Sequence, residues 1–309
     1  MSPKRDLVSV LDVQRDLVDL LGLAADIKKR TRAGESYEPL RGKSLAMIFE
    51  KASTRTRVSF EVGMTQLGGH ALFLSPSDLQ IGRGETIADT ARILSRYVDG
   101  ILYRAFRHRD VVELATHATV PVINGLDDKE HPCQIVSDLF TIRERKGNLH
   151  GRRLAYVGDG NNVCNSLLLG SAIAGLEMAA AVPKGYEPDE TILASAKRIA
   201  KGARSAVSVV RDPYEAVKSA DVVYTDVWVS MGMEAQAAER ERAFQSYQVN
   251  EKLVRAAKPD AIVMHCLPAH RGLEITDEVL DGPQSAVLDQ AENRLHAQKA
   301  ILARLLGGV

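Results

Sequence analysis

The segment at 53–57 combines residue types that suit an anion. It reads Ser-Thr-Arg-Thr-Arg and stands between an apolar run at 44–49 and a stretch with helical spacing at 56–67. Backbone N–H groups at a helix start lack partners, and the helix dipole favours negative charge there. The hydroxyls of Ser53 and Thr54 add donors, and the guanidinium of Arg55 matches phosphate oxygens. We therefore expect a phosphate site, with a capping serine followed by solvated arginines as the alternative.

Two further segments supply groups that could act beside a phosphate. Arg104 follows a strand-like run at 100–103, and the segment His-Pro-Cys-Gln at 131–134 opens a helical stretch. Pro132 suits the first helical turn, which would fix the direction of the His131 ring. Singly, each could be structural: the arginine in a salt bridge, the histidine as a cap. Because the carboxyl ends of parallel strands meet at one edge of a sheet, we expect these groups to gather, bind a phosphate and polarise an adjacent carbonyl group. The expected set is Arg55, Thr56, Arg104, His131 and Gln134.

The second half of the chain carries groups suited to an amino acid. The run Gly-Asp-Gly-Asn-Asn at 158–162 lacks a dinucleotide-binding fingerprint, because Val163 stands at the third glycine and no ribose-binding acid follows the next strand. We expect Asn161 or Asn162 to present its amide to a ligand. Asp226 precedes a Ser-Met-Gly loop and suits a cationic amine, with capping of a helix as the alternative.

Cys266 directly follows the last strand-like run, within His-Cys-Leu-Pro at 265–268. A buried, inert cysteine is the usual finding, and no base nearby in the sequence would make its thiol a nucleophile. The three cysteines suit neither a disulfide framework nor a metal pattern, and no Cys, His and carboxylate cluster has metal-ligand spacing. The sequence predicts no metal and no cofactor.

Strand-like and helix-like runs alternate along most of the chain, which predicts parallel pairing with crossover helices. The expected fold is α/β, with two lobes, each a parallel sheet flanked by helices, and a ligand cleft between them. We expect one domain at 1–147 and a second at 148–289, with a final helix at 290–309 packing back on the first. The expected strands lie at 44–49, 71–74, 100–103, 120–123, 153–157, 178–182, 206–210, 222–226 and 261–266.

Composition excludes several classes of protein. The chain has 309 residues, and its 40 Lys and Arg balance 40 Asp and Glu to a formal net charge of +0. This length suggests two domains, and no global field favours nucleic acid or an anionic membrane. The apolar runs are shorter than the about 20 residues that a membrane span needs. The N-terminus lacks the apolar core of a signal peptide. We expect a cytoplasmic protein that acts on small molecules.

Five motifs, in this order, resemble the ornithine carbamoyltransferases, within the aspartate/ornithine carbamoyltransferase superfamily. They are Ser-Thr-Arg-Thr-Arg at 53–57, His-Pro-Cys-Gln at 131–134, Asp-Gly-Asn-Asn-Val at 159–163, Asp-Val-Trp-Val-Ser-Met-Gly at 226–232 and His-Cys-Leu-Pro-Ala-His-Arg-Gly at 265–272. The resemblance covers nearly the whole chain. The first motif is shared with the aspartate-specific enzymes, whereas the Ser-Met-Gly loop and Cys266-Leu267 resemble the ornithine branch.

The resemblance implies transfer of a carbamoyl group from carbamoyl phosphate to the δ-amine of L-ornithine, giving L-citrulline and phosphate, in arginine biosynthesis. The implied catalytic residues are Arg104, His131, Cys266 and Asp226. The implied carbamoyl phosphate ligands are Ser53, Thr54, Arg55, Thr56, Gln80 from a neighbouring subunit, Arg104, His131, Gln134, Cys266, Leu267 and Arg294. The implied ornithine ligands are Asn162, Asp226, Ser230 and Met231. The implied assembly is a homotrimer or an assembly of trimers, and the residues leave the biosynthetic and degradative directions open.

Two alternatives remain at this point. A carbamoyltransferase for another amine, such as putrescine, would keep the first lobe and change the loop at Ser230. A non-catalytic protein that binds an anion or an amino acid could share the fold. Formation of citrulline would separate the enzyme from the binding protein.

Overall fold

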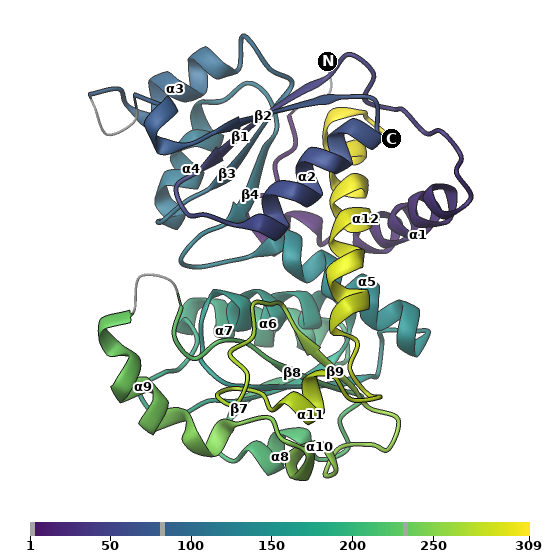
Figure 1. The fold of residues 1–309 in the computed structure, drawn as a ribbon, viewed down its shortest axis with the longest axis vertical. Coiled ribbons are helices and arrows are strands. Elements are labelled where there is room, and N and C mark those ends of the chain that lie inside the picture. The colour runs from purple at the N-terminus through teal and green to yellow at the C-terminus, as the bar shows by residue number, and fades with distance from the viewer. Residues whose placement is uncertain (1–3, 81–83, 231–233) are drawn as a thin grey trace. The chain divides into compact units, whose positions relative to one another are not determined.

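The computed structural model describes residues 4–80, 84–230 and 234–309. The chain divides into two compact units: unit 1 is Met1–Phe140 with Asn293–Val309, and unit 2 is Thr141–Glu292. Each contains a parallel sheet with helices around it (Figure 1). The divisions fall within α5 (Pro132–Lys146) and α12 (Val287–Leu306), at 140/141 and 292/293. The sequence had suggested 147/148 and 289/290.

Unit 1 is built on a sheet of four parallel strands in the order β2-β1-β3-β4. The strands are β1 (Ser44–Phe49), β2 (His70–Leu74), β3 (Gly100–Arg104) and β4 (Val122–Leu126). The central strands β1 and β3 are almost entirely buried, as their apolar sequences require, whereas the edge strand β2 is partly exposed. The helices that lie wholly in the described part of this unit are η1 (Val10–Val13), α1 (Leu17–Arg32), α2 (Thr54–Gln66), η2 (Pro76–Asp78), α3 (Ile87–Leu94) and α4 (His108–His117).

The strand order places a switch point between β1 and β3. The chain goes from β1 outwards to β2 and returns to the other side of β1 as β3, so the connections after these two strands run in opposite directions. Phe49 at the end of β1 pairs with Arg104 at the end of β3. In open parallel sheets, ligands bind beyond the carboxyl ends of the strands at such a point. The start of α2 and Arg104 therefore share the favoured edge of the sheet.

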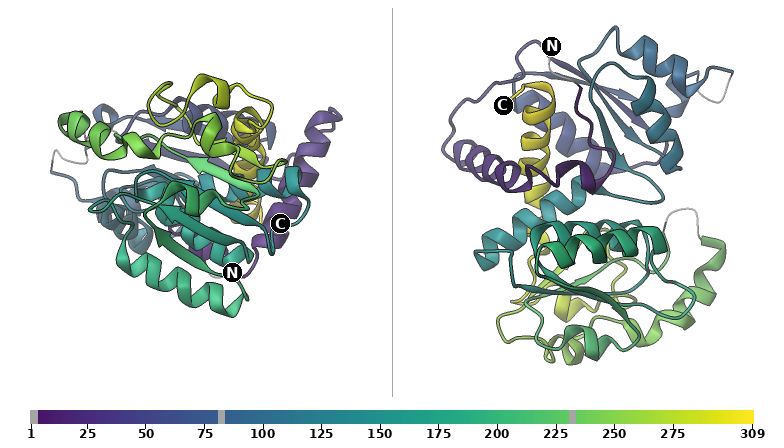
Figure 2. Two further views of the ribbon diagram at one scale, coloured as in Figure 1. Left: turned by 90° about the horizontal axis from the view of Figure 1, so that it is seen from below. Right: turned by 180° about the vertical axis from the view of Figure 1, so that it is seen from behind.

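The C-terminal part of α12 belongs to unit 1 and lies between α1 and α2 (Figures 1 and 2). The ammonium group of Lys299 donates to Thr31 of α1 at 2.8 Å and to Gln66 of α2 at 2.9 Å. Earlier in the same helix, Asn293 accepts a hydrogen bond from the buried Lys28 of α1 at 2.7 Å. These contacts fix the helix that carries Arg294.

Unit 2 is built on a sheet of five parallel strands in the order β7-β6-β5-β8-β9. The strands are β5 (Arg153–Val157), β6 (Glu177–Ala181), β7 (Val207–Val210), β8 (Val222–Thr225) and β9 (Ile262–His265). The helices α6 and α7 lie on one side of this sheet, and α8, α10 and α11 lie on the other (Figure 1). The helices of the described part are α6 (Asn162–Ala174), α7 (Glu190–Gly202), α8 (Pro213–Val217), η3 (Glu234–Gln236), α9 (Ala237–Phe244), η4 (Gln245–Tyr247), α10 (Glu251–Val254) and α11 (Asp277–Leu280).

Unit 2 repeats the switch point of unit 1 with different neighbours. The strands β5 and β8 are adjacent, and the chain leaves β5 towards β6 and β7 before it returns as β8. Tyr156 of β5 pairs with Tyr224 of β8, close to the carboxyl ends of both strands. The turn that begins α6 and the segment that contains Asp226 therefore meet at one edge.

The predicted α/β class and the two parallel sheets are confirmed. The strand expected at 120–123 was misplaced: β4 begins at Val122, because Pro121 has no N–H to give to the ladder. The short helices α10 and α11, of four residues each, were not predicted, since so few residues carry no periodic signal. In the part of the chain described here, no helix has the length and apolar character needed to span a membrane.

Candidate functional site

The start of α2 forms the first part of a basic site in unit 1. Ser53 is the N-cap residue, and its hydroxyl oxygen accepts a hydrogen bond from the backbone N–H of Thr56 at 3.3 Å. The same hydroxyl donates to Oγ1 of Thr56 at 3.1 Å. The capping role that the sequence left as an alternative is therefore present. It fixes the first helical turn, in which Arg55 is half-buried at the positive end of the helix dipole.

Arg294 of α12 links this turn to the start of α5. Its guanidinium donates one hydrogen bond to Oε1 of Gln134 and a second to Oγ1 of Thr56, the latter at 3.1 Å. Gln134 in turn donates to Asp138 at 2.8 Å. All four side chains are buried. Segments that are far apart in the sequence thus meet in one hydrogen-bonded group. Arg294 had been expected there only because of the family resemblance.

His131 and Arg104 complete the basic site, and both are buried. Burial, followed by the guanidinium charges of Arg294, Arg104 and Arg55, lowers the pKa of His131 well below its usual value. The imidazole is therefore neutral at neutral pH and can donate one N–H to an oxygen atom. The same three cations that disfavour a protonated imidazole would stabilise a bound anion. We define the basic site as Ser53, Thr54, Arg55, Thr56, Arg104, His131, Gln134 and Arg294.

The predicted carbamoyl phosphate ligands outside the basic site lie in other parts of the chain. Gln80 is exposed and follows η2 in unit 1, next to residues that the structure does not describe. Cys266 and Leu267 directly follow β9 in unit 2.

Asp226 is the centre of an acidic site in unit 2. It follows β8 and is 6% exposed. One carboxylate oxygen accepts a hydrogen bond from the Asn161 amide at 2.8 Å, and the other accepts from the Cys266 thiol at 3.0 Å. The carboxylate is therefore held by two other side chains. We define the acidic site as Asn161, Asn162, Asp226, Ser230 and Cys266.

The turn before α6 positions the two asparagines differently. Asn161 caps α6, because its Oδ1 accepts from the backbone N–H groups of Val163 and Cys164 at 3.0 and 3.1 Å. Asn162 is the first residue of the helix and is half-buried. Gly160 must be a glycine, since a Cβ there would lie 2.3 Å from the backbone of Pro188. Of the two asparagines that the sequence offered, Asn161 orients Asp226.

Ser230 and Met231 were predicted to bind ornithine. Ser230 follows Asp226 by four residues and is half-buried. Met231 lies outside the described residues.

The loop that carries Cys266 is held by a buried histidine that the sequence analysis did not single out. Nδ1 of His265 accepts a hydrogen bond from the backbone N–H of Leu267 at 2.9 Å, and Nε2 lies 3.1 Å from Oε1 of Glu274. Both side chains are fully buried. Leu267 has a positive φ of 58°, a conformation that needs support from its surroundings. Cys266 is thus fixed between two restrained neighbours.

Asp226, His265 and Cys266 could also be considered as metal ligands, since their ligand atoms lie within 4.8 Å of one another. However, both ring nitrogens of His265 already have partners, Leu267 and Glu274. A metal ion at this place would have to break one of these contacts. The set therefore fits a metal poorly, and the absence of a metal requirement stays a prediction.

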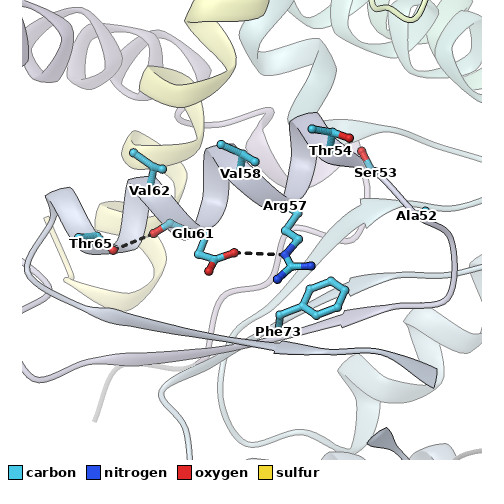
Figure 3. Close-up of a pocket in the computed structure, with 9 residues that line it drawn as sticks. All are labelled: Ala52, Ser53, Thr54, Arg57, Val58, Glu61, Val62, Thr65 and Phe73. Atoms are coloured by element: carbon cyan, nitrogen blue, oxygen red, sulfur yellow. Dashed lines mark hydrogen bonds and ion pairs between the residues drawn. The ribbon is translucent and has the colours of Figure 1, made fainter. Parts of the chain in front are cut away.

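A groove of about 770 Å³ runs along the outer face of α2 (Figure 3). The guanidinium of Arg57 lies 3.7 Å from the centroid of the Phe73 ring and 3.3 Å from the carboxylate of Glu61. Val58 is 51% exposed and Val62 is 38% exposed. The lining residues are Ala52, Ser53, Thr54, Arg57, Val58, Glu61, Val62, Thr65 and Phe73. Ser53 and Thr54 belong to both the groove and the basic site.

The structure thus combines two α/β units, with a cluster of basic groups in unit 1 and a buried, oriented carboxylate in unit 2. Residues 5–144 match the family model described as aspartate/ornithine carbamoyltransferase, carbamoyl-P binding domain. Residues 150–305 match the model described as aspartate/ornithine carbamoyltransferase, Asp/Orn binding domain. The chain belongs to the aspartate/ornithine carbamoyltransferase family.

Individual relatives are similar over nearly the whole chain. An ornithine carbamoyltransferase of Methanoculleus marisnigri is 58% identical and covers 99% of this chain and 98% of its own. A catabolic ornithine carbamoyltransferase of Thermoplasma acidophilum is 55% identical over 98% of this chain and 99% of its own. The solved structure of ornithine carbamoyltransferase from Pyrococcus furiosus is 54% identical, has a TM-score of 0.96, and covers 99% of this chain and 98% of its own. The resemblance to this family is confirmed.

Proposed function

We propose that this enzyme transfers the carbamoyl group of carbamoyl phosphate to the δ-amine of L-ornithine, giving L-citrulline and phosphate. The observation that carries the proposal is the similarity to ornithine carbamoyltransferases, 58% identity over 306 residues for the Methanoculleus marisnigri protein. The chemistry of the two sites agrees with it. The basic site suits a phosphate and a carbonyl oxygen, and the acidic site suits an ammonium group.

In this proposal the basic site binds carbamoyl phosphate. Ser53, Thr54, Arg55 and Thr56 bind the phosphate at the start of α2, where the helix dipole and the guanidinium both attract the anion. Arg104 bridges the phosphate and the carbonyl oxygen. His131 and Gln134 hold the carbamoyl group, His131 through the N–H of its neutral ring. Arg294 holds Thr56 and Gln134 in place, and Cys266 and Leu267 complete the carbamoyl phosphate ligands.

The acidic site would bind the α-carbon end of ornithine. Asp226 accepts the α-ammonium group, and Asn162 with the Ser230-Met231 segment orients the α-carboxylate. The support is that the Asp226 carboxylate is nearly buried and already oriented by Asn161 and Cys266. A desolvated and oriented carboxylate favours a cation more strongly than an exposed one.

The reaction would proceed by direct attack of the amine. The δ-amine resembles a lysine, whose pKa is about 10.4 in water, so desolvation must lower this value to release the neutral form. Attack on the carbonyl carbon forms a tetrahedral oxyanion, which Arg104, Thr56 and His131 stabilise. The C–O bond to phosphate then breaks, and the phosphate that leaves towards Arg55 accepts the proton that the amine loses. This reaction needs no covalent intermediate on Cys266. It also needs no metal ion and no cofactor.

The reaction is tested by measuring citrulline and phosphate with the purified enzyme. Carbamoyl phosphate with ornithine should yield citrulline and phosphate in equal amounts, and putrescine in place of ornithine should give far less product. Absence of citrulline would leave the non-catalytic binding protein as the better account. A preference for putrescine would support a carbamoyltransferase for another amine.

We propose assembly into a homotrimer, or into a larger set of trimers, as the resemblance to the family implies, and the groove on α2 offers a surface for a second copy of the chain. Val58 and Val62 leave an apolar face exposed, and this face continues into the basic site through Ser53 and Thr54. A second copy of the chain seated there would bring its own surface next to the phosphate site, which is what the proposed role of Gln80 requires. Hybrid complementation tests this role: a Gln80→Ala variant mixed with an Arg55→Ala variant should regain activity if the sites are shared. Failure to regain it in mixed oligomers, or a monomeric mass of 33.7 kDa in solution, would contradict the proposal.

The proposed setting is arginine biosynthesis in the cytoplasm. Carbamoyl phosphate is a mixed anhydride, so transfer to an amine is downhill and favours citrulline. Expression in a cell that lacks ornithine carbamoyltransferase and requires arginine should restore growth. Failure to restore growth by an enzyme that is active in the extract would contradict the biosynthetic assignment.

A further inference from the structure

We propose that Arg240 is a positioning residue of the acidic site, which it supports by tying together the two segments that carry Asn161 and Asp226. This inference rests on the proposed function, because it concerns the binding of ornithine. Arg240 stands in α9, outside the five motifs of the sequence analysis.

The guanidinium of Arg240 contacts both segments at the same time. Its Nη1 donates to Oδ2 of Asp159 at 2.7 Å and to the backbone oxygen of Trp228 at 2.9 Å. Asp159 precedes Asn161 by two residues, and Trp228 follows Asp226 by two residues. One side chain thus restrains the backbone on both sides of the hydrogen bond between Asn161 and Asp226.

Further contacts hold the guanidinium itself in one orientation. Nε of Arg240 donates to Gln236 at 3.2 Å, and the guanidinium lies 5.0 Å from the centroid of the Tyr186 ring. On the other side, the backbone oxygen of Asp159 accepts a hydrogen bond from the Tyr156 hydroxyl at 2.8 Å. The contacts therefore form a continuous chain from α9 to the end of β5.

The pair of charges is almost fully buried, with Arg240 7% exposed and Asp159 5% exposed. Burial raises the pKa of Asp159 to about 6, against the opposing attraction of Arg240. Removal of either partner leaves the other buried without its counter-charge, and the segment must move to regain solvent or a new partner. Such a movement of Asp159 displaces Asn161 relative to Asp226, because Asn161 follows Asp159 by only two residues.

Arg240 is not needed to hold α9 on the unit. Phe244 of the same helix is fully buried and stacks on Trp228, with ring centroids 5.9 Å apart. It also makes an edge contact with Tyr186 at 4.8 Å. Because Phe244 contacts Trp228 and Tyr186 directly, we expect a variant at 240 to fold while the acidic site loses its alignment.

The test compares Arg240→Met with Arg242→Met, a matched control two residues along the same helix. Arg242 is exposed, and its Nε donates to the backbone oxygen of Ala238 in its own helix at 3.1 Å. Arg240→Met should raise the KM for ornithine at least tenfold and leave the Kd for carbamoyl phosphate within twofold of the wild type. Arg242→Met should change neither. A merely structural role would lower the melting temperature and the fraction of active enzyme without raising this KM.

Two further variants sharpen the result. Asp159→Asn should raise the ornithine KM by a similar factor, and the double variant should add little, because both changes remove one contact. Arg240→Lys keeps the charge but has a shorter side chain and loses the hydrogen bond from Nε to Gln236, and it should raise the KM about threefold. If Arg240→Met does not fold, the ornithine KM of Arg240→Lys tests the inference instead.

An ornithine KM that stays within twofold of the wild type in a folded Arg240→Met or Arg240→Lys variant would overturn the inference. Fully additive effects of the Asp159 and Arg240 changes would do the same. The wild type separates this outcome from failure of the proposed function. A wild type that makes no citrulline contradicts the reaction, whereas an active wild type with insensitive variants contradicts only the role of Arg240.

Discussion

The basic site and the acidic site occupy equivalent places in two differently ordered sheets. In unit 1 the groups follow β1 and β3, and in unit 2 they follow β5 and β8, which in each case are the strands beside the switch point. The helix after the first strand of each pair begins at a polar cap, Ser53 or Asn161. The residues placed around these caps are opposite in charge. The topology therefore determines where a ligand can bind, and the few residues after the strands determine which ligand it is.

The two sites also differ in how their charges are supported. In the basic site, the charges of Arg294, Arg104 and Arg55 add to burial in lowering the pKa of a histidine, so the imidazole stays neutral beside them. In the acidic site, Asp226 accepts from an amide and a thiol, which orient the carboxylate without neutralising it. The charged groups of the two sites are thus of opposite sign. Variants that remove the central charge should impair one substrate and spare the other.

The largest effect is expected for Asp226→Ala on the choice between amines. A site built for polar partners can reject a substrate that lacks them by roughly 10⁴-fold, so the wild type should prefer ornithine to putrescine by that order in kcat/KM. Without the carboxylate, the α-ammonium group loses its partner, and the ratio should fall by at least about a hundredfold. The measurement is kcat/KM for both amines with wild type and variant, and the Kd for carbamoyl phosphate is the control. A variant that keeps the full preference for ornithine would show that Asp226 does not recognise the α-carbon.

Arg55→Ala is expected to have the next largest effect, on carbamoyl phosphate. Loss of one partner of a desolvated charge pair costs about 2–5 kcal/mol, which corresponds to about 30-fold to several thousand-fold in Kd. The protein should still fold, because Arg55 is only half-buried and Ser53 still caps α2. Titration calorimetry measures the affinity, and Arg92→Ala, an exposed arginine of α3 that pairs with Asp89, is the control. An unchanged affinity for carbamoyl phosphate in folded Arg55→Ala would show that the phosphate does not bind at the start of α2.

Sequence patterns could predict the strands and the segments that follow them, because burial and strand length are local properties. The runs at 44–49 and 153–157 match β1 and β5 residue for residue. Helix ends were less well predicted: the helical stretch expected at 56–67 begins at Thr54, directly after its cap Ser53, and ends at Gln66. The final helix, expected at 290–309, begins at Val287 and ends at Leu306.

Contacts between distant residues could not be predicted in the same way. Arg294 meets Gln134 across 160 positions, Arg240 meets Asp159 across 81, and Glu274 reaches His265 from a neighbouring loop. Such pairs depend on how helices and loops pack around the sheet, and a local sequence pattern does not predict this packing. Each segment by itself suggested a type of site, whereas the contacts that hold these residues in place became visible only in the structure.

The neutral His131 of the basic site predicts a pH dependence of stability that can be measured directly. Its pKa is lowered in the folded protein, so below about pH 6.5 the unfolded chain binds a proton that the folded protein does not. Acidification therefore favours unfolding, by about 1.4 kcal/mol per pH unit for this residue while its folded form stays neutral. Urea unfolding at pH 7.5 and 5.5, at one protein concentration, should show a smaller loss of stability for His131→Gln than for the wild type, by about 1 kcal/mol. Equal losses would mean that His131 takes up its proton in the folded protein, contrary to the electrostatics of the basic site.

The smallest effect is expected from removal of metal ions, and it tests the acidic site. Asp226, His265 and Cys266 are close enough to bind a cation, yet the His265 ring already bonds Leu267 and Glu274, and the Cys266 thiol donates its proton to Asp226. A metal ion would need a deprotonated thiol and a free ring nitrogen, and it would occupy the carboxylate that the proposal assigns to ornithine. EDTA treatment should therefore leave kcat and the ornithine KM unchanged, because Arg104, Thr56 and His131 supply the stabilisation of the oxyanion. Added Zn²⁺, which favours thiolate and imidazole ligands, should compete with ornithine rather than activate the enzyme. Loss of turnover with EDTA that a single divalent ion restores would contradict this and would make the acidic site a metal centre.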